Sequence, residues 1–144
     1  MESESTHNLI ETLANFRLSM KQYIQRKLRE GNFDVTFEML QVLGLLWRKQ
    51  DLNQQEIANA VQKNKASITP IIDNLTRRKL VMRSEDPADK RSRIISLTPA
   101  GREYKEQFMP VINEFYKLME DGLTQEEIEL ADRVIQKMNN NLNS

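Results

Sequence analysis

The chain has 144 residues, of which 39% are hydrophobic and 29% are charged, and its formal net charge is zero. This length suits one domain with a buried core, and the absence of cysteine excludes disulfides, thiolate metal sites and thiol-based redox sensing. No apolar run approaches a membrane span and the first residues do not resemble a signal peptide, so we expect a cytoplasmic protein without a membrane partner. With a single histidine, His7, we expect no metal site and no cofactor.

Two helices are expected first. Apolar residues at steps of three and four predict a long amphipathic helix over residues 5–30, which Gly31 and Asn32 would end. Thr36 can cap the next helix, whose apolar content indicates burial. Trp47, near the end of that helix, either packs in the core or lines an effector cavity.

A helix-turn-helix is predicted next. Asn53 and Glu56 form a capping-box pattern, so a short helix should begin near Gln54. Its apolar periodicity lapses over residues 62–65 and resumes in a second helix, which is the helix-turn-helix pattern. Polar residues of the second helix could donate to phosphates or base edges: Lys65, Ser67, Thr69, Asn74 and Arg78.

The pattern then changes to one typical of strands. Residues 80–84 and 93–97 are rich in branched or apolar side chains and predict two strands. The polar segment between them, residues 85–92, is too long for a minimal hairpin turn and carries the adjacent cations Lys90 and Arg91. We interpret this hairpin as the wing of a winged helix-turn-helix.

Two further helices should follow the wing. Thr98 can cap a helix that contains Pro110 and ends at Gly122, and a second capping box at Thr124 opens a last helix whose end, residues 139–141, should fray. The fold class is thus mainly α, with a small β-hairpin wing. The long amphipathic helices have apolar stripes too wide for so small a core, which favours a homodimer.

Charge is unevenly distributed along this neutral chain. Residues 63–93 carry a net charge of +5, whereas the segments before and after them carry −1 and −4. The positive segment coincides with the second helix of the helix-turn-helix and the wing, so double-stranded DNA is the expected partner. A solvated basic face is the alternative explanation of such a cluster.

The order of these motifs resembles the multiple-antibiotic-resistance regulator (MarR) family of bacterial winged-helix transcription factors over nearly the whole chain. Five motifs carry the resemblance: Gln55-Glu56-Ile57-Ala58, Ile68-Thr69-x-Ile71-Ile72-Asp73-Asn74-Leu75, Lys79-Leu80-Val81, Asp89-Lys90-Arg91 and Leu97-Thr98-Pro99-Ala100-Gly101. The chain departs from the family pattern at Pro70, where many relatives carry arginine, and at Lys79 and Leu80, where relatives often have glycine.

The resemblance implies one domain over residues 1–144, with a DNA-binding lobe over residues 36–97 and dimerisation helices over residues 5–30 and 98–142. It implies that Arg91 enters the minor groove with Asp89 bracing it, and that a cleft receives a small aromatic or amphipathic effector. Arg17, Met20, Leu43 and Trp47 could face that cleft. From the residue chemistry we expect phosphate contacts from Lys65, Arg77, Arg78, Lys90 and Arg93, and base contacts from Ser67, Thr69 and Asn74.

The expected function is a dimeric, sequence-specific transcriptional regulator, namely a ligand-responsive repressor on a palindromic operator. A winged-helix module that binds an acidic protein instead of DNA is the main alternative. We expect no enzymatic activity, because the chain has no glycine-rich phosphate loop, no cysteine and no carboxylate pair whose spacing indicates a site.

Overall fold

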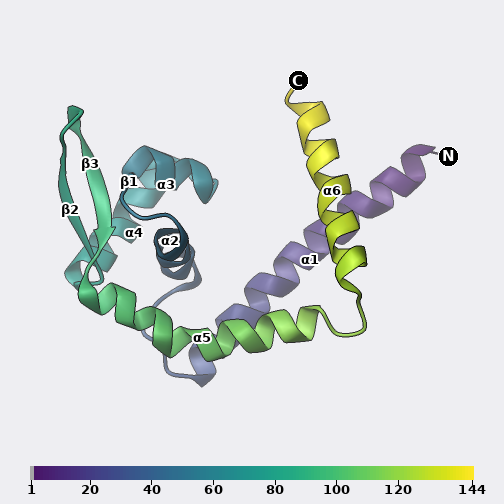
Figure 1. Cartoon of the computed structure of the whole chain (residues 1–144), viewed down its shortest axis with the longest axis horizontal. Helices are drawn as coiled ribbons and strands as arrows, with labels where there is room; N and C mark the ends of the chain where they lie inside the picture. The colour runs from purple at the N-terminus through teal and green to yellow at the C-terminus, as the bar shows by residue number, and fades with distance from the viewer. Residues whose placement is uncertain (1) are drawn as a thin grey trace. The chain divides into compact units, whose positions relative to one another are not determined.

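The computed structural model describes residues 2–144, which form six helices and a three-stranded sheet (Figure 1). The expected fold class, a mainly α winged helix-turn-helix, is confirmed. In chain order the elements are α1 (Glu2–Glu30), α2 (Phe37–Arg48), β1 (Leu52–Asn53), α3 (Gln54–Ala60), α4 (Lys65–Arg77), β2 (Val81–Asp86), β3 (Asp89–Leu97), α5 (Pro99–Met119) and α6 (Gln125–Leu142).

The chain divides into two compact units, Met1–Glu106 and Gln107–Ser144, and α5 runs through the boundary. The first unit contains the helix-turn-helix and the sheet. Its core is formed by fully buried aliphatic side chains of α2, α3, α4 and β3, among them Leu43, Leu46, Ile57, Ile68, Ile72, Leu75 and Ile95. None of the described helices is long and apolar enough to cross a bilayer.

The sheet has the order β1-β3-β2, with both pairs antiparallel. Strand β1 consists of only two residues, Leu52 and Asn53, which pair with Ile95 and Ile94 of β3. The sequence did not predict this strand, because two residues are too few to show an alternation of apolar and polar side chains. Asn53 also caps α3 as expected, so β1 attaches the start of the helix-turn-helix to the wing.

The expectation of a long loop at the tip of the hairpin was wrong. Strands β2 and β3 extend to Asp86 and Asp89, which pair with each other, and only Pro87 and Ala88 make the turn. The side chain of Asp86 accepts a hydrogen bond from the backbone amide of Ala88 at 2.9 Å. An aspartate side chain that bonds to the backbone two residues on stabilises a tight turn. The polarity of the segment indicates a loop and does not predict this turn.

After several helices, the residue in the left-handed conformation is not glycine. Helix α1 ends at Glu30, before Gly31 and Asn32 as expected; Asn32 has a positive φ of 54°, and Lys79 has a φ of 60° after α4. After α4 the amides of Lys79 and Leu80 bond to the carbonyl groups of Thr76 and Leu75, which is a Schellman motif. Lys79 therefore makes the turn into the wing without glycine.

Gly101, in the first turn of α5, allows three segments to meet. A side chain there would collide with the backbone carbonyl of Leu80. The amide of Gly101 donates to the hydroxyl of Thr98, the helix cap, and its carbonyl accepts a hydrogen bond from the indole of Trp47 at 3.0 Å. Thr98 in turn donates to the carbonyl of Lys79 at 2.6 Å. These bonds fix the start of α5 against α2 and the end of α4.

The second unit contains the rest of α5, the turn at Gly122 and α6. Thr124 and Glu127 form the predicted capping box, and hydrogen bonds from Thr124 lower the pKa of the Glu127 carboxyl group. The expected fraying of residues 139–141 is wrong, because α6 continues to Leu142. No residue of α6 is buried, although a row of apolar side chains runs along it: Leu130, Val134, Met138 and Leu142.

Candidate nucleic-acid interface

The turn of the helix-turn-helix is made by backbone bonds and two caps. Gln62, with a φ of 57°, ends α3, and the amide of Lys63 bonds to the carbonyl of Ala58 at 2.8 Å. Asn64 then caps α4 by accepting a hydrogen bond from the amide of Ser67 at 2.7 Å. These local bonds set the angle at which α4, the recognition helix, leaves the turn.

Helix α4 presents one face outward. Its buried residues, Ile68, Ile72 and Leu75, share one side. At 100° per residue, the side opposite to them is formed by four residues that are all exposed: Ala66, Pro70, Asp73 and Arg77. Pro70 therefore lies within the outward face of the recognition helix.

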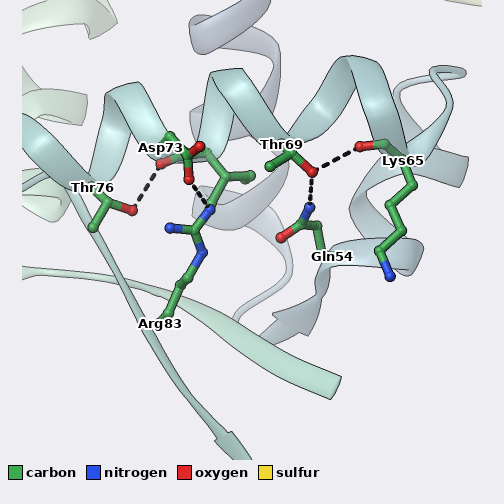
Figure 2. A network of polar contacts seen from close by, with 7 residues as sticks. Gln54, Lys65, Thr69, Asp73, Thr76 and Arg83 are labelled. Carbon is green, nitrogen blue, oxygen red and sulfur yellow. Dashed lines mark hydrogen bonds and ion pairs between the residues drawn. The ribbon is translucent and has the colours of Figure 1, made fainter. Parts of the chain in front are cut away.

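The predicted base-contacting residues differ in their surroundings. Ser67 is exposed. Thr69 is half-buried, accepts a hydrogen bond from the side-chain amide of Gln54 at 2.6 Å and donates to the carbonyl of Lys65 (Figure 2). Asn74 is also half-buried and accepts a hydrogen bond from the guanidinium of Arg78 at 3.0 Å. Two of the three side chains are thus engaged within the protein.

Arg78, a predicted phosphate contact, is held at the end of the recognition helix. Its guanidinium forms an ion pair with Asp34, in the segment between α1 and α2, at 2.8 Å. The ring of Tyr104 lies nearby, in edge contact with Phe33. Burial, followed by the negative charge of Asp34, raises the pKa of Tyr104 to about 12, against the lowering effect of Arg78. Arg78 is nevertheless an exposed residue, as are Lys65 and Arg77.

The wing carries a bulge next to its turn. Glu85 pairs with Arg93, and the next residue of β2, Asp86, pairs with Asp89, so residues 90–92 of β3 are extra and form a bulge. The far end of the hairpin stands clear of α3 and α4 (Figure 1). Lys90 and Arg91 therefore lie on the bulge, next to the turn that ends the wing.

Asp89 and Arg91 interact mainly through the backbone of the bulge. The carboxylate of Asp89 accepts a hydrogen bond from the amide of Arg91 at 3.0 Å, and its distance to the Arg91 guanidinium is 3.6 Å. The Arg91 side chain is 95% exposed. Arg93 turns back instead, and its guanidinium donates to the carbonyl of Lys90 at 3.1 Å. Arg91 is thus presented to solvent, whereas Arg93 contacts the bulge.

Sequence reasoning missed two residues that hold the recognition helix. Gln54 contacts Thr69 as described, and Arg83 of β2 forms an ion pair with Asp73 at 2.5 Å (Figure 2). The partners are separated by 15 and 10 residues along the chain, and no local pattern links them. A helical wheel of α4 would have placed Asp73 on the outward face, but it could not have supplied Arg83.

The four residues expected at an effector cleft do not share one environment. Leu43 is fully buried, so in this structure it belongs to the core and lines no open cleft. Trp47 and Met20 are half-buried, and Arg17 is exposed. A small cavity of about 50 Å³ in the first unit is lined by other residues, Leu46, Gln50, Asp51, Leu97 and Arg102, and it has room for little more than water.

These features define a winged helix-turn-helix: a capped two-helix motif, a recognition helix with an outward face, and a basic hairpin beside it. The model of the MarR family matches residues 36–92, the segment that contains the two-helix motif, β2 and the start of β3. The chain belongs to the MarR family of winged-helix transcriptional regulators and is a DNA-binding regulator, not an enzyme.

The chain is similar to several members of known sequence or structure. It is 31% identical over 110 residues to an uncharacterized HTH-type transcriptional regulator, YkoM of Bacillus subtilis. The aligned region covers 76% of this chain and 70% of YkoM. It is 37% identical over 87 residues to the HTH-type transcriptional repressor YetL of the same organism, covering 59% of this chain and 48% of YetL.

Two crystal structures of Staphylococcus aureus MepR share the fold. MepR in its DNA-binding conformation superimposes with a TM-score of 0.79 at 30% identity, covering 95% of this chain and 98% of MepR. The MepR–DNA complex superimposes with a TM-score of 0.76 at 31% identity, covering 94% and 96%.

Proposed function

We propose that the protein is a homodimeric, ligand-responsive repressor that binds a palindromic operator. The observation that carries the proposal is the position of Arg91. Its side chain is 95% exposed on the bulge of the wing, within the segment of net charge +5 that also contains α4. An exposed arginine at the end of a hairpin fits the narrow, negative minor groove beside a recognition helix in the major groove.

Uncovered apolar side chains support the dimer. In α1 they include Ile10, Leu13 and Phe16, which are 58%, 38% and 47% exposed, and α6 carries the apolar row described above. A helix face of this kind is stable in water only when another surface covers it. We therefore assign residues 5–30 and 98–142 to dimerisation, and two copies would place two recognition helices about 34 Å apart, as a palindrome requires.

Repression and operator binding are supported by the names and titles of relatives. YetL is named a repressor, and MepR has been crystallised both in a DNA-binding conformation and on DNA. Occupation of an operator would block transcription until an aromatic or amphipathic effector changed the spacing of the two lobes. Arg17, Met20 and Trp47 remain candidates for its contacts, and Leu43 would join them only if α2 repacked.

A salt titration tests the electrostatic part of the proposal. If the dimer neutralises about six phosphates, its affinity for duplex DNA should fall roughly a thousandfold between 50 and 200 mM salt. Fluorescence anisotropy of a labelled duplex measures this directly. An affinity that hardly changes over this range would contradict binding through the basic segment.

Selection of bound duplexes from a random pool tests symmetry and specificity together. The expected product is a palindrome whose half-sites lie one helical turn apart, about 10 base pairs. A set of unrelated sequences, or single half-sites, would contradict a symmetric dimer on its operator. A chain that binds no duplex even at low salt would favour the interaction-module alternative.

A further inference from the structure

The recognition helix contains one acidic residue, and this residue faces outward. Asp73 is the only acid in α4 (Lys65–Arg77), and it lies on the exposed face with Ala66, Pro70 and Arg77. Its side chain is 52% exposed. A carboxylate on the face that approaches DNA repels the phosphates unless a cation compensates it.

The neighbours of Asp73 on this face make compensation more important. Ala66 and Pro70 have no side-chain donor, and Pro70 also lacks a backbone amide. Arg77 is the cation of the four outward residues. An uncompensated Asp73 would cancel the formal charge of Arg77 on this surface.

Arg83 supplies the compensating charge from the wing. It lies on β2, where it pairs in register with Ile95 of β3, and its guanidinium reaches across to the carboxylate of Asp73 (Figure 2). The Arg83 side chain is 29% exposed, compared with 95% for Arg91. Arg83 is therefore directed at the helix, whereas Arg91 is directed at solvent.

The same ion pair joins two elements that approach DNA separately. Helix α4 would enter the major groove and the hairpin β2–β3 the minor groove, so their relative position decides whether both fit at once. The β2 end of this link is fixed by the sheet, and the α4 end by the buried residues Ile72 and Leu75 on either side of Asp73.

We propose that Arg83 is a positioning residue for DNA recognition, which acts through Asp73 by masking its charge and by holding the recognition helix against the wing. Arg83 itself contacts no DNA in this mechanism. The inference rests on the proposed DNA-binding function and adds to it how the wing and the helix act together.

A double-mutant cycle in the 144-residue chain tests this mechanism. Arg83→Gln should weaken binding to a duplex selected from the random pool by about tenfold or more, because it leaves Asp73 uncompensated. Asp73→Asn removes the carboxylate charge but keeps a side-chain oxygen that can accept a hydrogen bond from Arg83, so it should bind within about threefold of the wild type or more tightly. In the Asp73→Asn background, Arg83→Gln should change the affinity by no more than about threefold, because the charge that Arg83 masks is already absent.

The salt dependence separates this mechanism from a direct phosphate contact. A direct contact predicts the same loss from Arg83→Gln in both backgrounds and a salt slope reduced by about 1 per subunit, and this result would overturn the inference. An unchanged affinity of the single Arg83→Gln variant would overturn it as well. Rescue by Asp73→Asn with an unchanged salt slope supports it.

A measurement of the unfolding midpoint distinguishes a loss of DNA binding from a loss of folding. The ion pair is partly exposed, so the unfolding midpoint of Arg83→Gln should change by no more than a few degrees. If that variant does not fold, Arg83→Lys takes its place in the cycle. Lysine keeps the positive charge without the planar guanidinium group, so the loss of DNA affinity should be smaller. This loss should again disappear in the Asp73→Asn background. A wild type that binds no duplex contradicts the proposed function, whereas wild-type binding without coupling contradicts only the role of Arg83.

Discussion

Replacement of Arg91 by alanine is the sharpest test of the wing. The Arg91 side chain is 95% exposed, and its guanidinium lies 3.6 Å from the carboxylate of Asp89, so it contributes little to the fold. The amide of Arg91, which holds the bulge through Asp89, remains in the alanine variant. The free energy of unfolding should therefore change by less than about 0.5 kcal/mol.

The effect on DNA binding should be much larger. Loss of one arginine that contacts the groove costs about 1–3 kcal/mol, and a dimer loses two, so the affinity should fall by about 2–6 kcal/mol. The lower limit corresponds to a roughly thirtyfold weaker complex. The salt slope should also decrease, by up to about 2 per dimer, because two positive charges leave the interface.

Fluorescence anisotropy with the selected duplex measures the affinity, and urea unfolding measures the stability. Lys49→Ala is a matched control, because Lys49 is an exposed cation between α2 and β1, outside both the basic segment and the helices assigned to dimerisation. Its affinity should stay within about threefold of the wild type. If Arg91→Ala also binds within about threefold of the wild type, with the same salt slope, the wing has no part in DNA binding.

Three further predictions concern stability. Gly101→Ala should destabilise the first unit by about 2 kcal/mol or more, because the new methyl group collides with the Leu80 carbonyl. Gly44→Ala, in open space within α2, should stabilise the first unit by about 0.5–1 kcal/mol. Urea unfolding should therefore show opposite shifts for the two variants. The raised pKa of Tyr104, about 12 against an ordinary 10.0, means that its contribution is complete below pH 10 and is lost as the pH rises toward 12, so Tyr104→Phe should flatten the alkaline loss of stability in circular dichroism. Thr124→Ala should remove the cap of α6 at a cost of about 1 kcal/mol, and an unchanged helical signal and unfolding midpoint would show that the cap is dispensable.

The predictions that depended on neighbouring residues were largely confirmed. The caps at Thr36, Asn53 and Thr124 are formed as the sequence indicated, because a cap is a contact between residues three positions apart. The end of α1 before Gly31 and Asn32 was also predicted correctly. The long loop of the hairpin was wrong: the polar segment after Glu85 formed paired strands, since polarity alone does not exclude a strand.

The candidate site was only partly predictable. The sequence identified the basic segment, and the exposed position of Arg91 agrees with the expectation that it is available to a partner. It could not show that Thr69 and Arg78 are engaged by Gln54 and Asp34, because these partners are distant along the chain and the hydrogen bonds exist only after the helices pack. The base-contacting roles of the recognition helix therefore remain a prediction that the selection experiment must test.

The sequence by itself determined the succession of helices and strands, the place of the charge and the family, because apolar periodicity, caps and charge are properties of short stretches of chain. The apolar periodicity of α4 also indicates which of its sides faces outward, whereas only the tertiary structure decided which charges are paired and which remain exposed. Burial of Ile68, Ile72 and Leu75 fixes the rotation of that helix, and the fold of the sheet then brings Arg83 to Asp73. Such pairings depend on packing between segments far apart in the chain, which no local pattern records.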